Sequence, residues 1–305
     1  MKILITGGAG FIASHLVDAL ISAGHKVSVV DNLSTGDIYN VNKAANFYEV
    51  DILDSFKLKS IFEFEKPDLV SHHAAQTSVR LSEESPTNDV STNVIGTLNI
   101  LNLCLTYKVK KIVFSSTCAV YSEPSYLPMD EEHPIDPKSI YGLSKYTAEN
   151  YIRFFSKSSH LKYTIFRYGN VFGPRQNPLG EAGVVSIFTG QMLNGIRPVI
   201  YGDGNKTRDY VFVNDIVMAN LNVLDVAGDN QTFNLASGKE ISDFEIFSSV
   251  RNSIGIDVEP SFANIRKGEA ERVSLSIKKA NEILRWEPKT LLDQGILEVV
   301  RSIKK

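Results

Sequence analysis

Short apolar runs alternate with helical patterns through the first half of the chain. Residues 2–6 and 26–30 are mostly apolar segments of the length of one strand, and such segments predict strands buried inside a sheet. Between them, Leu16, Leu20 and Ile21 recur at the spacing of an amphipathic helix. Strand, helix and strand in this order are typical of a parallel sheet with helices packed against it.

The alternation continues to residue 167 and then stops. The pattern predicts further strands at 47–50, from 69, at 110–116 and at 163–167, and helices at 58–64, 88–107 and 141–155. Prolines and glycines then mark a loop-rich region, before a predicted strand at 208–213 and helices at 216–224, 243–254 and, as the last helix, 277–284. We therefore expect an α/β fold, with a Rossmann-type doubly wound parallel sheet and a smaller C-terminal α/β domain.

The composition excludes several classes of partner. The chain has 305 residues, of which 43% are hydrophobic and 22% charged, and its net charge is −3. This balance offers no basic surface for nucleic acid and no polybasic segment for a membrane. Two cysteines are too few for a disulfide framework, so we expect a cytoplasmic location. Glycines interrupt the first apolar run before a signal peptide or membrane span can form.

A glycine-rich turn follows the first predicted strand. Gly7, Gly8 and Gly10 precede a helix, and glycine at such a turn lets the backbone approach a pyrophosphate and meet it with free amides. The second predicted strand ends about 20 residues later in Asp31, a spacing typical of a dinucleotide-binding unit. A carboxylate there accepts hydrogen bonds from ribose hydroxyls and repels a 2′-phosphate. The pattern predicts binding of NAD rather than NADP.

Tyr141 and Lys145 lie four residues apart on a predicted helix and therefore share one face. A tyrosine that acts as a base at neutral pH needs its pKa lowered by roughly three units, or about 4 kcal/mol. One lysine ~6 Å away supplies about 3 kcal/mol at an effective dielectric constant of ~20. A second cation is needed, and the oxidised nicotinamide of NAD would be one.

Other reactive side chains fit structural roles better. His72 and His73 are adjacent on a predicted strand, so their side chains point to opposite faces and no acidic cluster joins them. We expect both histidines to be packing residues and predict no metal site. Cys118 could be a nucleophile, but a lone cysteine without an obvious base is more often a small buried hydrophobe.

Taken together, these motifs resemble the extended short-chain dehydrogenase/reductases, and among them the nucleotide-sugar 4-epimerases of the UDP-glucose (UDP-galactose) type. The resemblance covers essentially the whole chain. The matching segments are 6–12, 31–36, 72–79, Pro86 with Asp89, Asn93, Gly96 with Thr97, 115–121, 141–145, 167–175 and 208–210.

The resemblance implies a role for each matching residue. Tyr141 would be the base, Lys145 its electrostatic partner and ribose anchor, and Thr117 the hydroxyl that binds the substrate. The cofactor positions would be Gly7, Gly10, Phe11, Ile12, Asp31, Asn32, Thr35, Asp51, Ile52, Ala74, Gln76, Lys145 and Tyr168. The substrate positions would be Thr117, Tyr141, Asn170, Arg208, Arg266 and Val273. Residues 1–166 and 209–239 would form the NAD-binding domain, and 167–208 and 240–305 the nucleotide-sugar domain.

The implied reaction is oxidation at C4 of a UDP-hexose to a 4-keto sugar, rotation of that sugar, and return of the hydride to its other face. The expected pair is UDP-glucose and UDP-galactose. Val273 matches a position beside the sugar where a bulky tyrosine would exclude an N-acetyl group, so N-acetylated sugars are expected to fit. Departures from the family pattern at Lys267 and Glu271 leave the sugar and the nucleotide base open.

Three alternatives share the cofactor-binding motifs. A 4,6-dehydratase of this family carries an Asp-Glu pair after the catalytic threonine, whereas Cys118 and Ala119 follow Thr117 here. A nucleotide-sugar decarboxylase has no distinguishing signature and stays open. A non-catalytic NAD-binding regulator would not need Tyr141 and Lys145.

The long helices predicted at 88–107 and 141–155 resemble those of a four-helix interface in this family, so we expect a homodimer.

Overall fold

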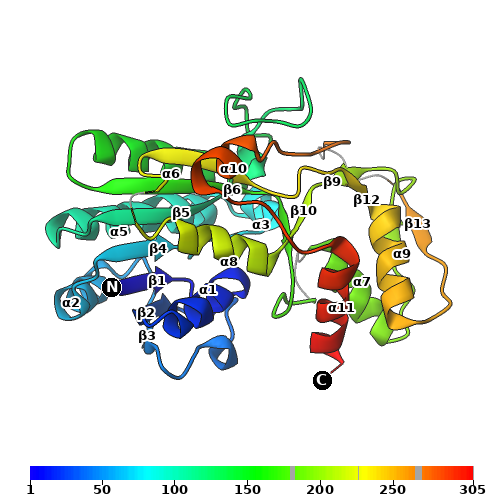
Figure 1. Cartoon of the computed structure of the whole chain (residues 1–305), viewed down its shortest axis with the longest axis horizontal. Coiled ribbons are helices and arrows are strands. Elements are labelled where there is room, and N and C mark those ends of the chain that lie inside the picture. The colour runs from blue at the N-terminus through cyan, green and yellow to red at the C-terminus, as the bar shows by residue number, and fades with distance from the viewer. Residues whose placement is uncertain (179–182, 226, 265–269, 305) are drawn as a thin grey trace. The chain divides into compact units, whose positions relative to one another are not determined.

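A computed structural model describes residues 1–178, 183–225, 227–264 and 270–304 of the chain. Within the described residues, the largest sheet has seven strands in the order β3-β2-β1-β4-β5-β6-β11 (Figure 1). The strands are β1 (Lys2–Thr6), β2 (Lys26–Asp31), β3 (Asn46–Glu49), β4 (Leu69–His72), β5 (Lys111–Thr117), β6 (Lys162–Tyr168) and β11 (Gln231–Leu235). The pairs β1/β2, β2/β3, β1/β4 and β4/β5 are parallel. This order is that of a doubly wound Rossmann sheet, so the predicted fold class is confirmed.

Successive residues of β1 point to opposite faces of the sheet and meet different helices. Leu4 belongs to a buried cluster with Phe62 and Ile152, so α2 (Ser55–Glu65), α5 (Gly96–Thr106) and α6 (Ile140–Lys157) cover that face. Ile3 faces Leu16 of α1 on the other side. The helices of this part of the chain are α1 (Phe11–Ser22), α2 (Ser55–Glu65), α3 (Val79–Glu84), α4 (Pro86–Val90), α5 (Gly96–Thr106), α6 (Ile140–Lys157) and α8 (Val213–Asn222).

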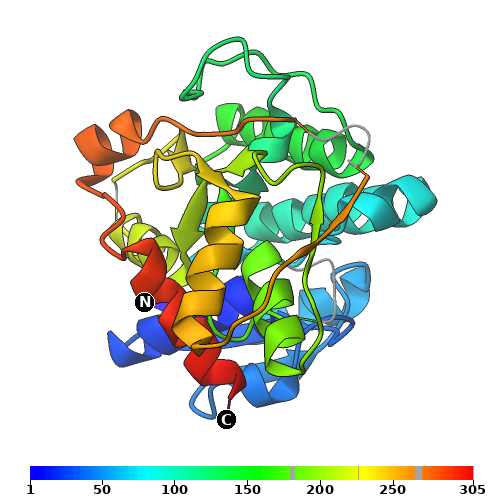
Figure 2. The ribbon, with the colours of Figure 1, turned by 90° about the vertical axis from the view of Figure 1, so that its right-hand side faces the viewer.

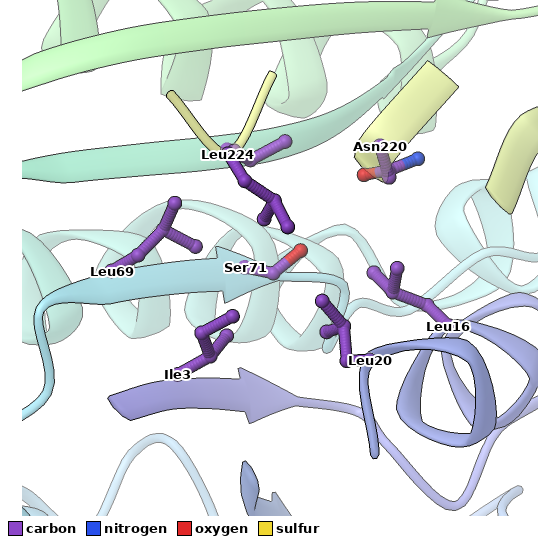
Figure 3. Close-up of a pocket in the computed structure, with 8 residues that line it drawn as sticks. Ile3, Leu16, Leu20, Leu69, Ser71, Asn220 and Leu224 are labelled. Carbon is purple, nitrogen blue, oxygen red and sulfur yellow. The ribbon is translucent and has the colours of Figure 1, made fainter. Parts of the chain in front are cut away.

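The packing between the sheet and α1 leaves one small cavity, of about 10 Å³ (Figure 3). Apolar side chains of β1, α1 and β4 line it, together with the polar side chains of Ser71 and Asn220. That volume is at the lower limit for a single water molecule. This cavity is therefore too small for a substrate.

The helix predicted at 88–107 is wrong as a single continuous element. It begins at Pro86, and a π-helical turn, η2 (Ser91–Ile95), separates α4 from α5. The hydroxyl of Thr97 donates to the carbonyl oxygen of Asn93 in this turn, at 2.7 Å. Such turns insert an extra residue into a helix and occur often at functional sites. Here the turn itself packs against α6, where Asn93 Nδ2 lies 3.1 Å from Ser144 Oγ.

The chain divides into two units by internal packing. The first consists of Met1–Ser122, Pro134–Arg167 and Val217–Phe233, and the second of Glu123–His133, Tyr168–Ile216 and Asn234–Lys305. Assignment of one unit to the cofactor and the other to the substrate stays a prediction. None of the described helices combines the length and apolar character needed to cross a membrane.

Three helices form the core of the second unit. Figure 2 shows α9 (Asp243–Ile254) between α7 (Val184–Leu193) and α11 (Leu292–Ile303). Where α7 meets α9, the ring centroids of Phe188 and Phe247 are 6.2 Å apart. The other elements of this unit are β7 (Asn170–Phe172), β8 (Val199–Tyr201), β9 (Thr207–Arg208), β10 (Tyr210–Phe212), β12 (Ile241–Ser242), β13 (Ser261–Ala263) and α10 (Lys278–Leu284). The prediction that the last helix ends at 284 is wrong, because α11 buries Ile296, Val299 and Val300 at helical spacing.

The strand predicted at 208–213 is also interrupted. It consists of two short strands, β9 and β10, on either side of Asp209. The Asp209 carboxylate is fully buried and accepts hydrogen bonds from the N–H groups of Ser237, Gly238 and Leu275 at 2.6 to 3.0 Å. Because these bonds draw Asp209 toward other loops, it does not continue a strand.

Candidate active site

The glycine turn after β1 lies pressed against the backbone that follows β4. Gly7 has a φ of +72° and donates from its N–H to the carbonyl oxygen of Val30 at 2.8 Å. A Cβ atom at this position would lie 2.7 Å from the backbone nitrogen of Ala74. Both the positive φ and this close approach require glycine. The predicted residues Gly7 and Ala74 therefore lie together.

Helix α1 begins at this turn with free backbone amides. Gly10 is its N-cap, and no side chain among the described residues caps the helix. The first-turn N–H groups of an α-helix lack intrahelical partners and carry the positive end of the helix dipole. Phe11 and Ile12, both predicted site residues, supply two of these groups. This end of α1 can bind a phosphate.

The acidic residue at the end of β2 is fixed beside the glycine turn. Asp31 is buried and accepts from the N–H groups of Ala9 at 2.9 Å and Leu33 at 2.8 Å. The next residue, Asn32, donates from Nδ2 to the carboxylate of Asp51 at 2.7 Å. The structure thus brings these three predicted residues to one edge of the sheet. Of the other cofactor candidates, Thr35 is exposed and Ile52 is buried.

The catalytic candidates meet where α6 approaches the end of β5. Ser139 caps α6 by accepting from the N–H of Gly142 at 3.0 Å. Gly142 packs directly against the carbonyl oxygen of Ala119 in η3 (Cys118–Val120), where a Cβ atom would not fit. This close contact brings Tyr141 near Thr117, whose side chain acts on the phenol as a hydrogen-bonding partner and lowers its pKa. Gly142 is a residue that the sequence analysis did not single out.

Lys145 lies one turn further along α6, almost fully buried. Its Nζ lies 4.2 Å from the centre of the Phe114 ring, and it makes no hydrogen bond or ion pair with any described residue. Burial lowers the pKa of Lys145 to about 7, against the charges of Glu149 and Asp89, which raise it. The ammonium therefore has three unused donors facing an apolar ring.

The pKa of Tyr141 moves in the direction opposite to the one that a base requires. Burial raises the pKa of Tyr141 above its ordinary value, while the hydrogen bond with Thr117 lowers it. The protein by itself does not generate a phenolate at neutral pH. This agrees with the estimate made from the sequence, in which the charge of Lys145 lowers the pKa of Tyr141 too little and a second cation is needed.

A buried ion cluster anchors the far half of α6. The Glu149 carboxylate is fully buried and accepts from Arg167 Nε at 3.0 Å and Nη2 at 2.8 Å, from Arg153 Nη2 at 2.7 Å, and from Ser116 Oγ at 2.5 Å. These charged hydrogen bonds hold the pKa of Glu149 below its usual value, although burial opposes them. Sequence reasoning missed this cluster, whose one local signal was Glu149 four residues after Lys145.

The two histidines serve as internal hydrogen-bonding groups. His72 Nδ1 lies 2.6 Å from Thr6 Oγ1, and its Nε2 lies 3.0 Å from Thr97 Oγ1. His73 Nε2 lies 3.0 Å from Ser71 Oγ. Burial lowers the pKa of both histidines, that of His73 to about 3, so both are neutral at neutral pH. Across the described part of the chain, no group of His, Cys, Asp and Glu side chains could hold a metal ion.

Asn170 and Arg208, two of the residues predicted to bind the nucleotide, belong to the second unit. Asn170 opens β7, which pairs in parallel with β10. Arg208 Nη1 donates to the carbonyl oxygens of Thr207 and Ala270, both at 2.8 Å. These two bonds fix the position of the guanidinium.

The remaining candidates are less defined by contacts. Val273 is half-buried and lies in a loop, not in a strand. Tyr168 is buried at the end of β6 and is the first residue of its segment in the second unit. Arg266 lies outside the described residues.

Comparison with known proteins assigns the chain to a family. The model of the NAD dependent epimerase/dehydratase family matches residues 3–236, and the chain belongs to this family. The solved UDP-glucose 4-epimerase of Thermotoga maritima, determined with UDP-glucose, is 45% identical, with a TM-score of 0.97 and coverage of 100% of this chain and 99% of that one.

Two further solved structures extend the comparison. The UDP-glucose 4-epimerase of Thermus thermophilus, in complex with NAD, is 39% identical with a TM-score of 0.93, over 100% of this chain and 99% of that one. The UDP-N-acetylglucosamine 4-epimerase of Methanobrevibacter ruminantium is 33% identical with a TM-score of 0.94, over 99% of this chain and 98% of that one.

The first unit has the features that a bound NAD requires. The uncapped first turn of α1 can hold the pyrophosphate, and Gly7 lets the backbone come close to it. Asp31 retains lone pairs for ribose hydroxyls beside its two backbone hydrogen bonds. The unused donors of Lys145 can bind the second ribose. Family and geometry agree that the cofactor is NAD.

Proposed function

We propose that this protein is an NAD-dependent nucleotide-sugar 4-epimerase that interconverts UDP-glucose and UDP-galactose. The observation that carries the proposal is the position of Tyr141 beside Thr117, whose side chain lowers the pKa of the phenol, one helical turn from the buried ammonium of Lys145. Similar proteins named UDP-glucose 4-epimerase, aligned over the whole chain, support the choice of substrate.

Each residue of this group has a separate task in the reaction. Tyr141 takes the proton from the sugar 4-hydroxyl and gives it back after the sugar has turned its other face. Thr117 orients that hydroxyl by hydrogen bonding, and Lys145 stabilises the phenolate. When bound, NAD accepts hydride from C4 and returns it, so the configuration inverts without net oxidation. Asn170, Arg208 and Arg266 are proposed to bind the nucleotide diphosphate, and Tyr168 to contact the cofactor.

The test is a product analysis with a small panel of nucleotide sugars. UDP-glucose and UDP-galactose should each yield a mixture of both, with NAD copurifying and no net NADH formed, because the hydride returns within each cycle. Stoichiometric NADH would instead indicate a dehydrogenase. Release of carbon dioxide from UDP-glucuronic acid, or loss of water from dTDP-glucose, without epimerisation would favour the alternatives. Turnover of no sugar would indicate a regulator.

Substrate breadth is proposed to depend on Val273. Valine lacks most of the volume of the tyrosine that would close the pocket against a 2-acetamido group. We expect UDP-N-acetylglucosamine to be epimerised within about tenfold of UDP-glucose, a difference of ~1.4 kcal/mol in transition-state binding. The solved UDP-N-acetylglucosamine 4-epimerase that resembles this chain supports the choice of sugar.

The Val273→Tyr variant tests this assignment directly. It should reduce kcat/KM for UDP-N-acetylglucosamine at least tenfold more than for UDP-glucose, because only the acetylated sugar needs the space. Val258→Tyr in the same unit, also half-buried, is a control that should show no such selectivity. Equal losses for both sugars in Val273→Tyr would refute the assignment.

We also propose a homodimer that uses the exposed face of η2 and α6. Leu143 and Phe154 on α6 are 52% and 68% exposed, and Val90 and Ile95 on the neighbouring helix are 43% and 46% exposed. Large apolar side chains gathered on two adjacent helices are typical of an interface. Light scattering at micromolar concentration should give twice the chain mass of 33.8 kDa. A monomer mass would reject the dimer.

A cytoplasmic location is proposed from the cysteines. Cys104 is buried in the core, Cys118 is half-buried, and both are free thiols. Free thiols are typical of reducing compartments. Fractionation of cells that express the tagged chain should recover it with cytoplasmic markers, and recovery outside the cell would contradict the proposal.

A further inference from the structure

Asp89 is a fully buried carboxylate in the helix that packs against α6. Its Oδ2 accepts hydrogen bonds from Gln76 Nε2 at 2.9 Å and Asn93 Nδ2 at 3.1 Å. Its Oδ1 is equally buried and finds no hydrogen-bond partner in the part of the chain that the structure describes. Both partners of Oδ2 are neutral amides, so no positive side chain among the described residues contacts this acid.

The Asp89 network leads to the catalytic helix. Asn93 Nδ2 also lies 3.1 Å from Ser144 Oγ, and Ser144 Oγ donates to the carbonyl oxygen of Tyr141 at 3.0 Å. Asn93 in the π-helical turn thus bonds both to Asp89 in the preceding helix α4 and to Ser144 in α6. The network joins the acid to the backbone of the candidate base.

A second buried acid, Glu149, has a different charge balance. Arg167 and Arg153 both contact Glu149 at less than 3 Å, so two positive charges offset its single negative charge. Lys145 has no carboxylate in contact with it among the residues described. Asp89 and Lys145 are therefore the two buried charges of this region that contact no opposite charge.

We propose that Asp89 is the counter-charge of the catalytic pair, a positioning residue whose carboxylate holds the Lys145 ammonium protonated and opposes ionisation of the Tyr141 phenol. The proposal rests on the proposed function only for the roles of Tyr141 and Lys145. A buried carboxylate acts on these groups through the low dielectric of the interior without touching them. Burial has the largest effect on the pKa of each group, Glu149 also raises the pKa of Lys145 and Cys118 that of Tyr141, and the charge of Asp89 raises both pKa values in addition.

Other groups face the pair, and two of them, Glu149 at Lys145 and Cys118 at Tyr141, act in the same direction as Asp89. His72 and His73 on the β4 side are neutral at neutral pH, because burial lowers the pKa of each. Cys118 and Thr117 face Tyr141 from the end of β5. Glu149 faces Lys145 along α6 and raises its pKa, but Glu149 and its two arginines are unchanged in the two measurements that test Asp89.

Asp89→Asn removes the charge and keeps the hydrogen bonds. The amide oxygen can occupy the position of Oδ2 and accept from Gln76 and Asn93. Its NH2 group then lies where the unpartnered Oδ1 is, and so displaces no donor. Asp89→Ala, in contrast, removes both the charge and the two hydrogen bonds.

The first measurement is the pH dependence of kcat/KM for UDP-galactose. In Asp89→Asn both limbs should move to lower pH by about one unit, with the maximum reduced less than about threefold. Asp89→Ala should show the same displacement with a lower maximum. A reduced maximum with unmoved limbs in both variants would mean that Asp89 is only structural and would overturn the proposal.

The second measurement needs no catalysis and uses cofactor-free protein. Lys145 has its pKa lowered to about 7, so its burial costs stability below pH 7, and this cost disappears as the pH rises toward its ordinary value. Asp89→Asn should therefore destabilise the protein more at pH 6 than at pH 9. A displacement of about one pKa unit corresponds to ~1.4 kcal/mol.

Lys145→Met provides the matched background for this second measurement. There the effect of Asp89→Asn on the free energy of unfolding should no longer depend on pH, because the titrating partner is gone. A pH-dependent effect that persists without Lys145, or a pH-independent effect in the parent chain, would overturn the proposal. If the sugar panel shows no epimerisation, this measurement still decides the role of Asp89.

Discussion

Replacing Tyr141 with phenylalanine is expected to reduce kcat for UDP-galactose epimerisation by about 10³-fold, or about 4 kcal/mol in activation free energy. The phenyl ring keeps the packing of the start of α6, whereas the group that accepts and returns the proton is absent. The change removes the interaction of the phenol with Thr117 from the folded state, at a cost of about 1 kcal/mol. The variant should fold and retain NAD.

The measurement compares turnover, bound NAD and thermal unfolding on one preparation. Tyr146→Phe is the matched control, since Tyr146 lies on the same helix and is also half-buried. It removes a hydroxyl from α6 without removing the base, so its turnover should stay within about twofold of the parent. Turnover of Tyr141→Phe close to that of the parent would show that another group is the base.

The order of the first strands and helices could be predicted from the sequence because buried parallel strands are read directly as apolar runs. The elements that were wrong depend on contacts between distant residues. The split of β9 and β10 follows from hydrogen bonds between Asp209 and residues as far along as Leu275. The π-helical turn around Asn93 has no signature in hydrophobic periodicity.

The residues of the candidate site likewise divide into those that the sequence predicts and those that only the structure reveals. Gly7, Asp31, Tyr141 and Lys145 stand at fixed spacings that the chemistry itself demands, and these spacings are visible in the sequence. The role of Asp89 cannot be predicted from such a spacing, because it depends on which side chains contact Asp89 after folding. Among the described residues, no positively charged side chain does. A carboxylate in the sequence is most often a solvated surface group, and only the structure shows that this one is buried.

Burial also explains why Lys145 alone does not make Tyr141 a base at neutral pH. Burial lowers the pKa of Lys145 to about 7, so its charge at neutral pH depends on its neighbours. The same burial raises the pKa of Tyr141. A buried catalytic pair therefore needs a surrounding charge arrangement, and at Lys145 the charges of Glu149 and Asp89 both contribute to it.

Glu149→Gln is expected to destabilise the protein by about 3–5 kcal/mol. Two arginines would lose the Glu149 carboxylate, and the Arg167 side chain, which is 4% exposed, would keep a buried positive charge without that carboxylate. The pKa of Glu149 is held below its usual value in the folded protein. The contribution of Glu149 to the free energy of unfolding is therefore complete above the usual pKa and is lost as the pH falls through the lowered pKa. The difference from the parent should therefore shrink below about pH 4.

Denaturant unfolding at pH 7 measures this loss, with Arg153→Gln as the matched control. The Arg153 side chain is 24% exposed, and its removal leaves the Glu149–Arg167 pair intact, so it should cost about 1 kcal/mol or less. The double variant Glu149→Gln with Arg167→Met removes both charges of the pair and should regain at least half of the lost stability. Equal costs for Glu149→Gln and Arg153→Gln would mean that the cluster does not hold α6 against the sheet through a buried ion pair.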